Sequence, residues 1–287
     1  MGTVFDAVTL GSLYALLAVG LSLVYGVVGI PHFAQAGVLA TAALLMVFLG
    51  TAGLPFVAMV LIGMLAAGVL AILIERLAYT PILRGNPTAV AGPAVALGIL
   101  LILDSANLLV WGAQRRVIPV PYGSTSVTLL GERIAVLRLV VVGLAVIAIT
   151  ALQLFLRRTR TGRSIVAVSQ DQVAARLVGV GVRRTTTAAF FISGLLAGVA
   201  ALAFGTLTPA YPYMADTVIL SAFVVIIIGG LGSVPGAIVG GFLVGIAEVA
   251  GTALISGAYA PVYAFVVLLA VLMVKPNGLF GRKVRSS

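Results

Sequence analysis

The sequence predicts an all-α polytopic membrane protein with about eight to nine transmembrane helices, some of them discontinuous. Three observations predict this fold class. Apolar residues make up 62% of the 287 residues and charged residues only 8%, whereas soluble domains carry about 25% charged residues. The apolar runs are close to about 20 residues long, which suits membrane helices rather than barrel strands of about ten. Glycine and proline interrupt two of the runs, which predicts breaks in the helices.

The length rule for membrane helices gives nine apolar spans, two of them short or interrupted. The spans cover residues 8–30, 34–53, 55–78, 88–110, 134–156, 187–206, 216–232, 234–254 and 258–274. We expect one transmembrane domain over residues 1–287, with a cytoplasmic segment at 157–186. No basic region precedes the first apolar run, so no cleaved signal peptide is expected.

Basic residues are concentrated beside the apolar spans. Of the 17 lysines and arginines, seven fall between Arg157 and Arg184 and four between Lys275 and Arg285. This placement is the positive-inside pattern, which predicts a cytoplasmic C-terminus and an external segment at 111–133. It argues against nucleic-acid binding, although the net charge is +10.

Two glycine- and proline-rich breaks occur in corresponding places of the two halves of the chain. They are the stretches Tyr25–Pro31 and Ile228–Gly236. Irregular backbone at membrane depth must be buried in protein or line a cavity, and paired breaks are typical of internal repeats with a path between them. The alternative is two ordinary helix–turn–helix connections at the membrane face.

The segment Thr161–Gly179 predicts a short helix outside the bilayer. Ser169 and Gln172 fit a capping box, Asp171 adds negative charge in the first turn, and Gly179 ends the helix. Its apolar residues at helical spacing are Val173, Ala174, Leu177 and Val178. This face either packs on the chain itself or on lipid headgroups, or it is a coupling helix that sits on a separate ATPase.

Several separated motifs resemble one family, the H-type permease of branched-chain amino-acid ABC importers, across nearly the whole chain. They are Gly11–Leu16, Val24–Gly26, Ile74–Tyr79, Gly162–Gly179, Gly229–Ala237 and Gly245–Glu248. The resemblance implies a type II-like importer permease that forms a heterodimer with a second, related permease. It also implies two ATPase subunits, which bind ATP and Mg, and a periplasmic or lipid-anchored substrate-binding protein. This chain would bind no cofactor itself.

The resemblance also implies roles for individual residues. The positions carried over to ATPase coupling are Gly162, Arg163, Asp171, Ala175, Leu177 and Gly179. The candidate substrate pathway consists of Tyr25, His32, Phe33, Gln35, Gly232, Ser233 and Glu248. The stretch Pro31–Gly37 departs from the family pattern, because Gln35 stands where the family usually has histidine and His32 precedes Phe33. His32 is therefore read either as a pathway residue or as a helix-end residue with satisfied bonds.

Catalytic chemistry and metal binding are not expected. The chain has no cysteine and one histidine, and its only lysines, Lys275 and Lys283, lie outside any phosphate-binding loop. The alternative function is a proton-coupled secondary transporter of a small solute, which would use Asp104 and Glu248 as carriers. We expect Asp104 to snorkel or cap a helix end, and Glu248 to line the path or to bond to a neighbouring helix.

Overall fold

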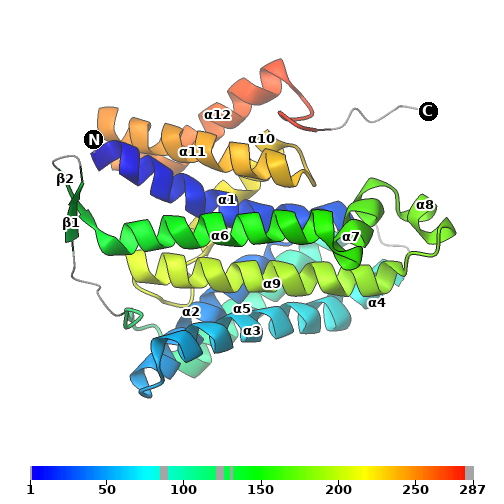
Figure 1. Ribbon diagram of the computed structural model, residues 1–287, viewed down its shortest axis with the longest axis horizontal. Helices are drawn as coiled ribbons and strands as arrows, with labels where there is room; N and C mark the ends of the chain where they lie inside the picture. Colours follow the sequence, from blue (N-terminus) through cyan, green and yellow to red (C-terminus); the bar gives the residue numbers. More distant parts are fainter. Residues whose placement is uncertain (1, 85–89, 121–125, 130–131, 282–287) are drawn as a thin grey trace.

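The computed structural model describes residues 2–84, 90–120, 126–129 and 132–281. Eight helical segments within these ranges are long and apolar enough to cross a membrane. The long helices are α1 (Gly2–Val28), α2 (Ala34–Thr51), α3 (Phe56–Ile74), α5 (Ala91–Trp111), α6 (Val136–Arg158), α9 (Val182–Leu207), α11 (Val234–Leu254) and α12 (Ala260–Val274). They lie side by side as an elongated bundle (Figure 1). The predicted all-α membrane fold is confirmed.

Shorter elements complete the chain. They are the π-helix η1 (Glu75–Tyr79), α4 (Thr80–Arg84), β1 (Ser126–Leu129), β2 (Glu132–Ala135), α7 (Arg160–Gln170), α8 (Gln172–Leu177), α10 (Asp216–Gly229) and the 3-10 helix η2 (Gly257–Tyr259). The ninth expected span, 216–232, is the short helix α10, whose apolar part is Val218–Gly229. The antiparallel hairpin of β1 and β2 was not predicted from the sequence.

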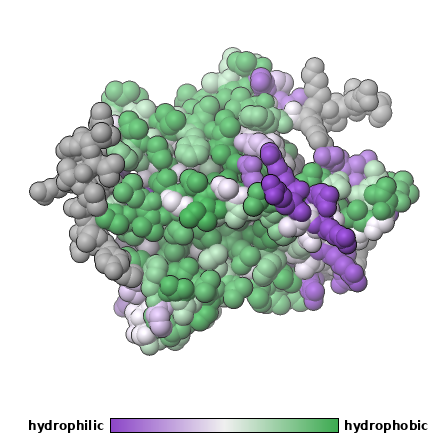
Figure 2. All heavy atoms as spheres, in the orientation of Figure 1, coloured by the Kyte–Doolittle hydropathy of each residue, from purple (hydrophilic) through white to green (hydrophobic). Residues whose placement is uncertain are grey.

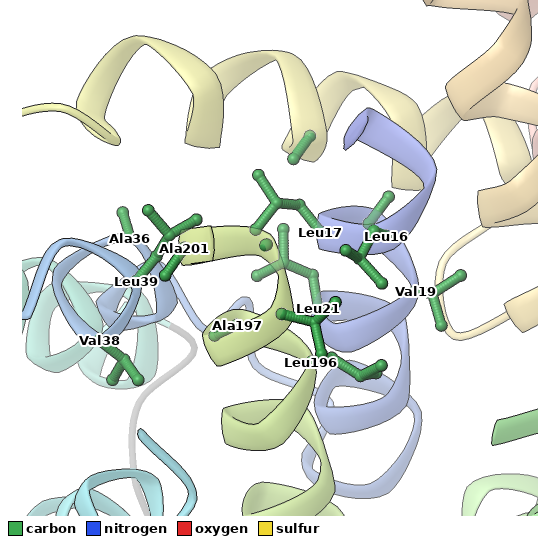
Figure 3. Close-up of a cluster of buried hydrophobic side chains, with 14 of the residues drawn as sticks. Leu16, Leu17, Val19, Leu21, Ala36, Val38, Leu39, Leu196, Ala197 and Ala201 are labelled. Carbon is green, nitrogen blue, oxygen red and sulfur yellow. The ribbon is translucent and has the colours of Figure 1, made fainter. Parts of the chain in front are cut away.

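Three helices form the centre of the bundle. In the most apolar stretch of 18 residues of α1, α2 and α9, 67–89% of the residues are buried inside the protein. In the corresponding stretch of α12 only 6% are buried. Leu17 and Leu21 of α1, Leu39 of α2 and Leu196 and Ala197 of α9 belong to this core (Figure 3). The outer helices therefore keep apolar faces free for lipid or for another protein.

In lipid the hydrophobic effect does not favour contact between helices, so the helices associate through close packing. Glycines allow this close approach. A Cβ atom on Gly198 of α9 would lie 2.6 Å from Cα of Met64 in α3. A Cβ atom on Gly245 of α11 would lie 2.5 Å from Cα of Gly11 in α1. These contacts show that Gly198 and Gly245 lie on helix-packing surfaces.

The two ends of the bundle differ in chemistry. The basic end carries α7, α8 and the chain after α12, while the opposite, hairpin end carries β1, β2 and the start of α1 (Figure 1). Hydrophilic residues gather around α7, whereas α8 beyond it and the long side of the bundle in view are largely apolar (Figure 2). The described basic residues of this end include Arg76, Arg157, Arg158, Arg160, Arg163, Arg176, Arg183, Arg184 and Lys275.

Candidate translocation and coupling sites

The two glycine-rich breaks meet at the basic end of the bundle. The first lies between α1 and α2 and the second between α10 and α11. A Cβ atom on Gly232 would lie 3.2 Å from Cα of Gly26, and Gly232 has a φ of +80°, so this contact requires glycine. Ser233 accepts a hydrogen bond from the backbone N–H of Gly236 at 3.2 Å and so caps α11. Both breaks are short connections between successive helices, and they touch each other.

A pocket of about 800 Å³ opens beside this contact. Tyr25, Gly232 and Ser233 line it, so three of the seven predicted pathway residues share one site. Ser169 and Gln170 at the end of α7 line the same pocket. The remaining lining residues are Ser22, Leu23, Gly26, Gly29, Gln153, Leu156, Arg157, Ile165, Val166, Ile227, Leu231, Val234, Pro235, Pro276, Asn277, Phe280 and Gly281. The pocket therefore borders both the helix breaks and the segment predicted for coupling.

His32 lies outside this pocket, is buried, and packs against the aromatic rings of Tyr79 and Phe190. Its Nδ1 atom is hydrogen-bonded to the hydroxyl of Tyr79 at 2.9 Å. Its ring packs edge-on against Tyr79 and Phe190, with centroids 5.3 and 5.0 Å away. Burial lowers the pKa of His32, in the turn between α1 and α2, to about 3, so the ring is neutral. This environment matches that of a satisfied helix-end residue.

Phe33 and Gln35 are also packing residues in this structure. The ring of Phe33 lies 5.0 Å from that of Phe223 in α10. Oε1 of Gln35 accepts a hydrogen bond from the hydroxyl of Ser193 in α9 at 3.2 Å. Neither residue lines the pocket at the basic end.

Glu248 lies towards the hairpin end, far along α11 from the breaks. Its Oε2 atom accepts a hydrogen bond from the hydroxyl of Tyr14 in α1 at 2.7 Å. Glu248 also lines a second pocket, of about 330 Å³, together with Thr3 and Asp6. The predicted pathway residues thus occupy three separate places: the basic-end pocket, the packed α1–α2 turn and this α1–α11 contact.

The predicted coupling helix consists of two short helices, α7 and α8, joined at Asp171. Asp171 is the N-cap residue, because its Oδ1 accepts from the N–H groups of Val173 and Ala174 at 2.8 and 2.9 Å. The predicted cap at Ser169 is wrong, since its hydroxyl donates instead to the carbonyl oxygen of Val166 at 2.8 Å. The stop at Gly179 is confirmed, with a φ of +83° just after α8.

The other predicted coupling positions divide between buried and exposed sites. Gly162 in the first turn of α7 is packed against the end of α6, where its added Cβ would lie 2.6 Å from Cα of Leu156. Ala175 lies on the buried face of α8, while Arg163 is exposed. Leu177 is 84% exposed. Exposed apolar side chains at this polar end form a surface that none of the described residues covers.

Three contacts at functional places were not predicted. Gln172 donates from Nε2 to the carbonyl oxygen of Val27 at 2.6 Å and joins α8 to α1. Glu75, in the π-turn η1, accepts from Thr80 at 2.6 Å and from Thr187 at 3.0 Å. π-turns inside helices often occur at functional sites, but no residue pattern in the sequence predicts this one.

A bundle of long apolar helices with a polar, capped segment at one end defines a polytopic membrane protein. The family model for the branched-chain amino acid transport system permease component matches residues 3–275. This chain therefore belongs to that family.

Two relatives and one solved structure match almost the whole chain. The chain is 32% identical to the high-affinity branched-chain amino acid transport system permease protein LivH of Escherichia coli (strain K12), over 97% of this chain and 94% of LivH. It is 30% identical to the permease protein BraD of the corresponding system in Pseudomonas aeruginosa, over 96% of this chain and 94% of BraD. PsaBC from Streptococcus pneumoniae, solved in complex with Fab, has a TM-score of 0.53 at 13% identity, over 98% and 94% of the two chains. The last match supports the fold alone.

Proposed function

We propose that this chain is the transmembrane subunit of an importer that moves branched-chain or related amino acids inward, driven by ATP hydrolysed on other chains. The names of LivH and BraD support the substrate class. A separate energy source is supported by the sequence, which contains no phosphate-binding motif. We propose that residues 1–287 act as a single permease domain in the bacterial inner membrane.

The proposed orientation places the basic end in the cytoplasm. Seven of the basic residues lie between Arg157 and Arg184, next to the ends of α6 and α9, and such excess marks cytoplasmic loops. The C-terminus would then be cytoplasmic too, and the hairpin end would face outwards. Residues 157–186 form the proposed coupling segment.

The exposed apolar surface of α8 is the observation that carries the proposal. Val173, Leu177 and Val178 are 68%, 84% and 79% exposed. They lie at the polar end of the molecule, where lipid tails do not cover them under the proposed orientation. Such a surface fits a hydrophobic groove on a partner protein. We assign it to an ATPase subunit, with Asp171 and Gly179 fixing the two ends of α8.

The basic-end pocket is the proposed inner part of the substrate pathway. Tyr25, Gly232 and Ser233 line it, and Gln172 connects α8 to the last turn of α1 beside it. Movement of α8 by an ATPase would therefore reach the pocket wall directly. The packing of His32, Phe33 and Gln35 supports a structural role for these three residues.

The proposed assembly contains a second, related permease, two ATPase subunits that bind ATP and Mg, and an external substrate-binding protein. α12 and α11 leave wide apolar faces uncovered, since only 6% and 28% of the residues in their most apolar stretches are buried. These faces are available to the second permease or to lipid.

The test is purification of tagged chain from native membranes, with the variants Leu177→Arg and Val117→Arg. Both positions are exposed, but Val117 lies near the hairpin end. We expect wild type and Val117→Arg to recover two ATPase subunits and a second permease, and Leu177→Arg to lose the ATPases and ATP-driven uptake. Retention of both by Leu177→Arg would refute the coupling role. Recovery of wild-type chain alone would favour the proton-coupled transporter.

A further inference from the structure

The basic-end pocket contains a buried hydroxyl that has no partner in the described part of the chain. Ser22 of α1 lines the pocket and is 0% exposed, and its Oγ atom makes no hydrogen bond to any described residue. The hydroxyls of Thr9 in α1 and Thr41 in α2 instead donate to the carbonyl oxygen four residues earlier, at 2.8 Å each. Buried polar atoms in folded proteins are almost always hydrogen-bonded, because an unpartnered one is destabilising. Ser22 therefore indicates a polar binding position in the pocket.

Three helices present one face each to this pocket. Ser22 and Gly26 of α1 are four residues apart and line it together, as do Gln153 and Arg157 of α6. Ser169 of α7 lines it too, and a Cβ atom on Gly26 would lie 3.2 Å from Cβ of Ser169. The hydroxyl of Ser22, the amide of Gln153 and the guanidinium of Arg157 thus belong to one cavity.

The charge of the lining selects one kind of ligand. Arg157 is the only charged residue among the described residues that line the pocket, and none of these residues is acidic. Apolar side chains from five helices complete the wall, and the volume of about 800 Å³ suits a small organic molecule. They include Leu23, Leu156, Ile165, Ile227 and Val234. An anionic group joined to an apolar chain matches both parts of the lining.

We propose that the basic-end pocket recognises its substrate by the carboxylate and the apolar side chain, and not by the ammonium group. The inference rests on the proposed function for its substrate, a branched-chain amino acid. Arg157 pairs with the carboxylate, and the hydroxyl of Ser22 and the amide of Gln153 donate hydrogen bonds to it. The 2-oxo acid with the same carbon chain then binds as the amino acid does, whereas the amine that lacks the carboxylate does not.

A single introduced thiol tests this recognition, because the chain has no cysteine. Gln170 is exposed and lines the pocket, so maleimide labelling of Gln170→Cys is followed in the purified full-length chain with the subunits that accompany it. Leucine and 4-methyl-2-oxopentanoate should slow labelling as their concentrations rise, and 3-methylbutylamine should not. Gln114→Cys, exposed near the hairpin end, is the control and should be labelled at the same rate with all three compounds.

Four results overturn the proposed recognition. The first is equal protection by leucine and 3-methylbutylamine, and the second is protection by leucine but not by its 2-oxo acid, because the ammonium group would then be recognised. The third is protection by inorganic phosphate and by neither carboxylate, which would assign the pocket to a phosphate group. The fourth is labelling that none of these compounds changes.

Two neighbouring arginines provide a matched pair of variants in the Gln170→Cys background. Arg157→Gln should raise the leucine concentration needed for half protection about tenfold or more, because a charge-assisted hydrogen bond is lost. Arg158→Gln removes the same charge from a residue that does not line the pocket and should leave protection unchanged. Ser22→Ala should weaken protection several-fold. Equal effects of Arg157→Gln and Arg158→Gln would overturn the role of Arg157.

Copurification and uptake separate this inference from the proposed function. A complex that contains the ATPases and takes up leucine, but in which leucine does not protect Gln170→Cys, would refute the pocket assignment alone. Protection by leucine and by its 2-oxo acid in a chain that recovers no ATPase would refute the proposed energy source and support the pocket assignment.

Discussion

Gln172 on α8 and Val27 in the last turn of α1 are joined by a hydrogen bond of 2.6 Å from Nε2 to the main-chain carbonyl oxygen. Val27 lies where α1 ends, so its carbonyl oxygen has no acceptor role within the helix. The bond therefore stabilises both the end of α1 and the position of α8. It is a direct polar link between the proposed coupling segment and the central helix of the bundle.

Gln172→Ala should uncouple these two helices without removing the exposed apolar surface of α8. A hydrogen bond of this kind contributes about 0.5–1.5 kcal/mol, so we expect ATP-driven uptake to fall several-fold while the ATPases still copurify. Gln114→Ala, an exposed glutamine near the hairpin end, is the control and should change neither. Loss of ATPase binding in Gln172→Ala would mean that Gln172 helps to bind the ATPase rather than to pass the movement of α8 to α1.

The cap at Asp171 predicts a difference between two substitutions of the same residue. Asp171→Ala removes the acceptor for the N–H groups of Val173 and Ala174, which costs about 0.5–2 kcal/mol. Asparagine is also a good N-cap residue, so Asp171→Asn should retain most of the helix. Hydrogen exchange of the α8 amides should be faster in Asp171→Ala than in Asp171→Asn. Equal exchange in the two variants would contradict the capping role.

The membrane helices were predictable because bilayer thickness fixes the length of an apolar run. Expected spans such as 34–53 and 234–254 agree with α2 and α11 to within two residues. The exact cap was not predictable, since Ser169 and Asp171 are both good N-cap residues and only the backbone angles decide between them. Asp171 has the extended φ and ψ of a cap, whereas Ser169 lies inside α7.

The grouping of the site residues was harder to predict than the helices. Tyr25 and Ser233 line the same pocket because the turn after α1 touches the turn between α10 and α11. The glycines in these two turns predicted breaks in the helices. Glu248 does not join them, because it lies four turns into α11, and sequence spacing does not say which helix it faces. Asp104 does not snorkel or cap a helix end as expected, because it lies on the buried face of α5 and is only 3% exposed.

The close contact of α1 and α11 predicts opposite effects for two glycine-to-alanine substitutions. In Gly245→Ala the new Cβ would lie 2.5 Å from the N and Cα atoms of Gly11. Because backbone cannot yield as a side chain can, we expect a loss of about 1–3 kcal/mol. Gly143→Ala in α6 meets nothing within 4 Å and should be neutral or stabilising by up to about 1 kcal/mol.

Thermal unfolding in detergent measures both glycine variants. Gly245→Ala should have a Tm several degrees below that of the wild type, and Gly143→Ala a Tm equal to or above it. If Gly245→Ala were as stable as Gly143→Ala, α1 and α11 would have to be further apart than the structure places them.

Burial of neutral His32 predicts a stability that falls in acid. The pKa of His32 is about 3 in the folded chain and about 6.5 in the unfolded chain. Between these values the unfolded chain binds the extra proton, so stability decreases by about 1.4 kcal/mol for each pH unit below about 6.5. Unfolding at about pH 7 and about pH 5.5 should therefore show a lower Tm at the acidic pH.

The variant His32→Phe separates this effect from the titration of other groups. Phenylalanine keeps the contact with Phe190 but cannot bind a proton, so the fall in Tm between the two pH values should be smaller than in the wild type. Tyr79→Phe removes the 2.9 Å hydrogen bond yet keeps the imidazole, and should retain the acid sensitivity. An equal fall in His32→Phe and wild type would show that His32 does not remain neutral in the folded chain. Unchanged substrate preference in His32→Phe would agree with a packing role for this residue, since its side chain does not reach the basic-end pocket.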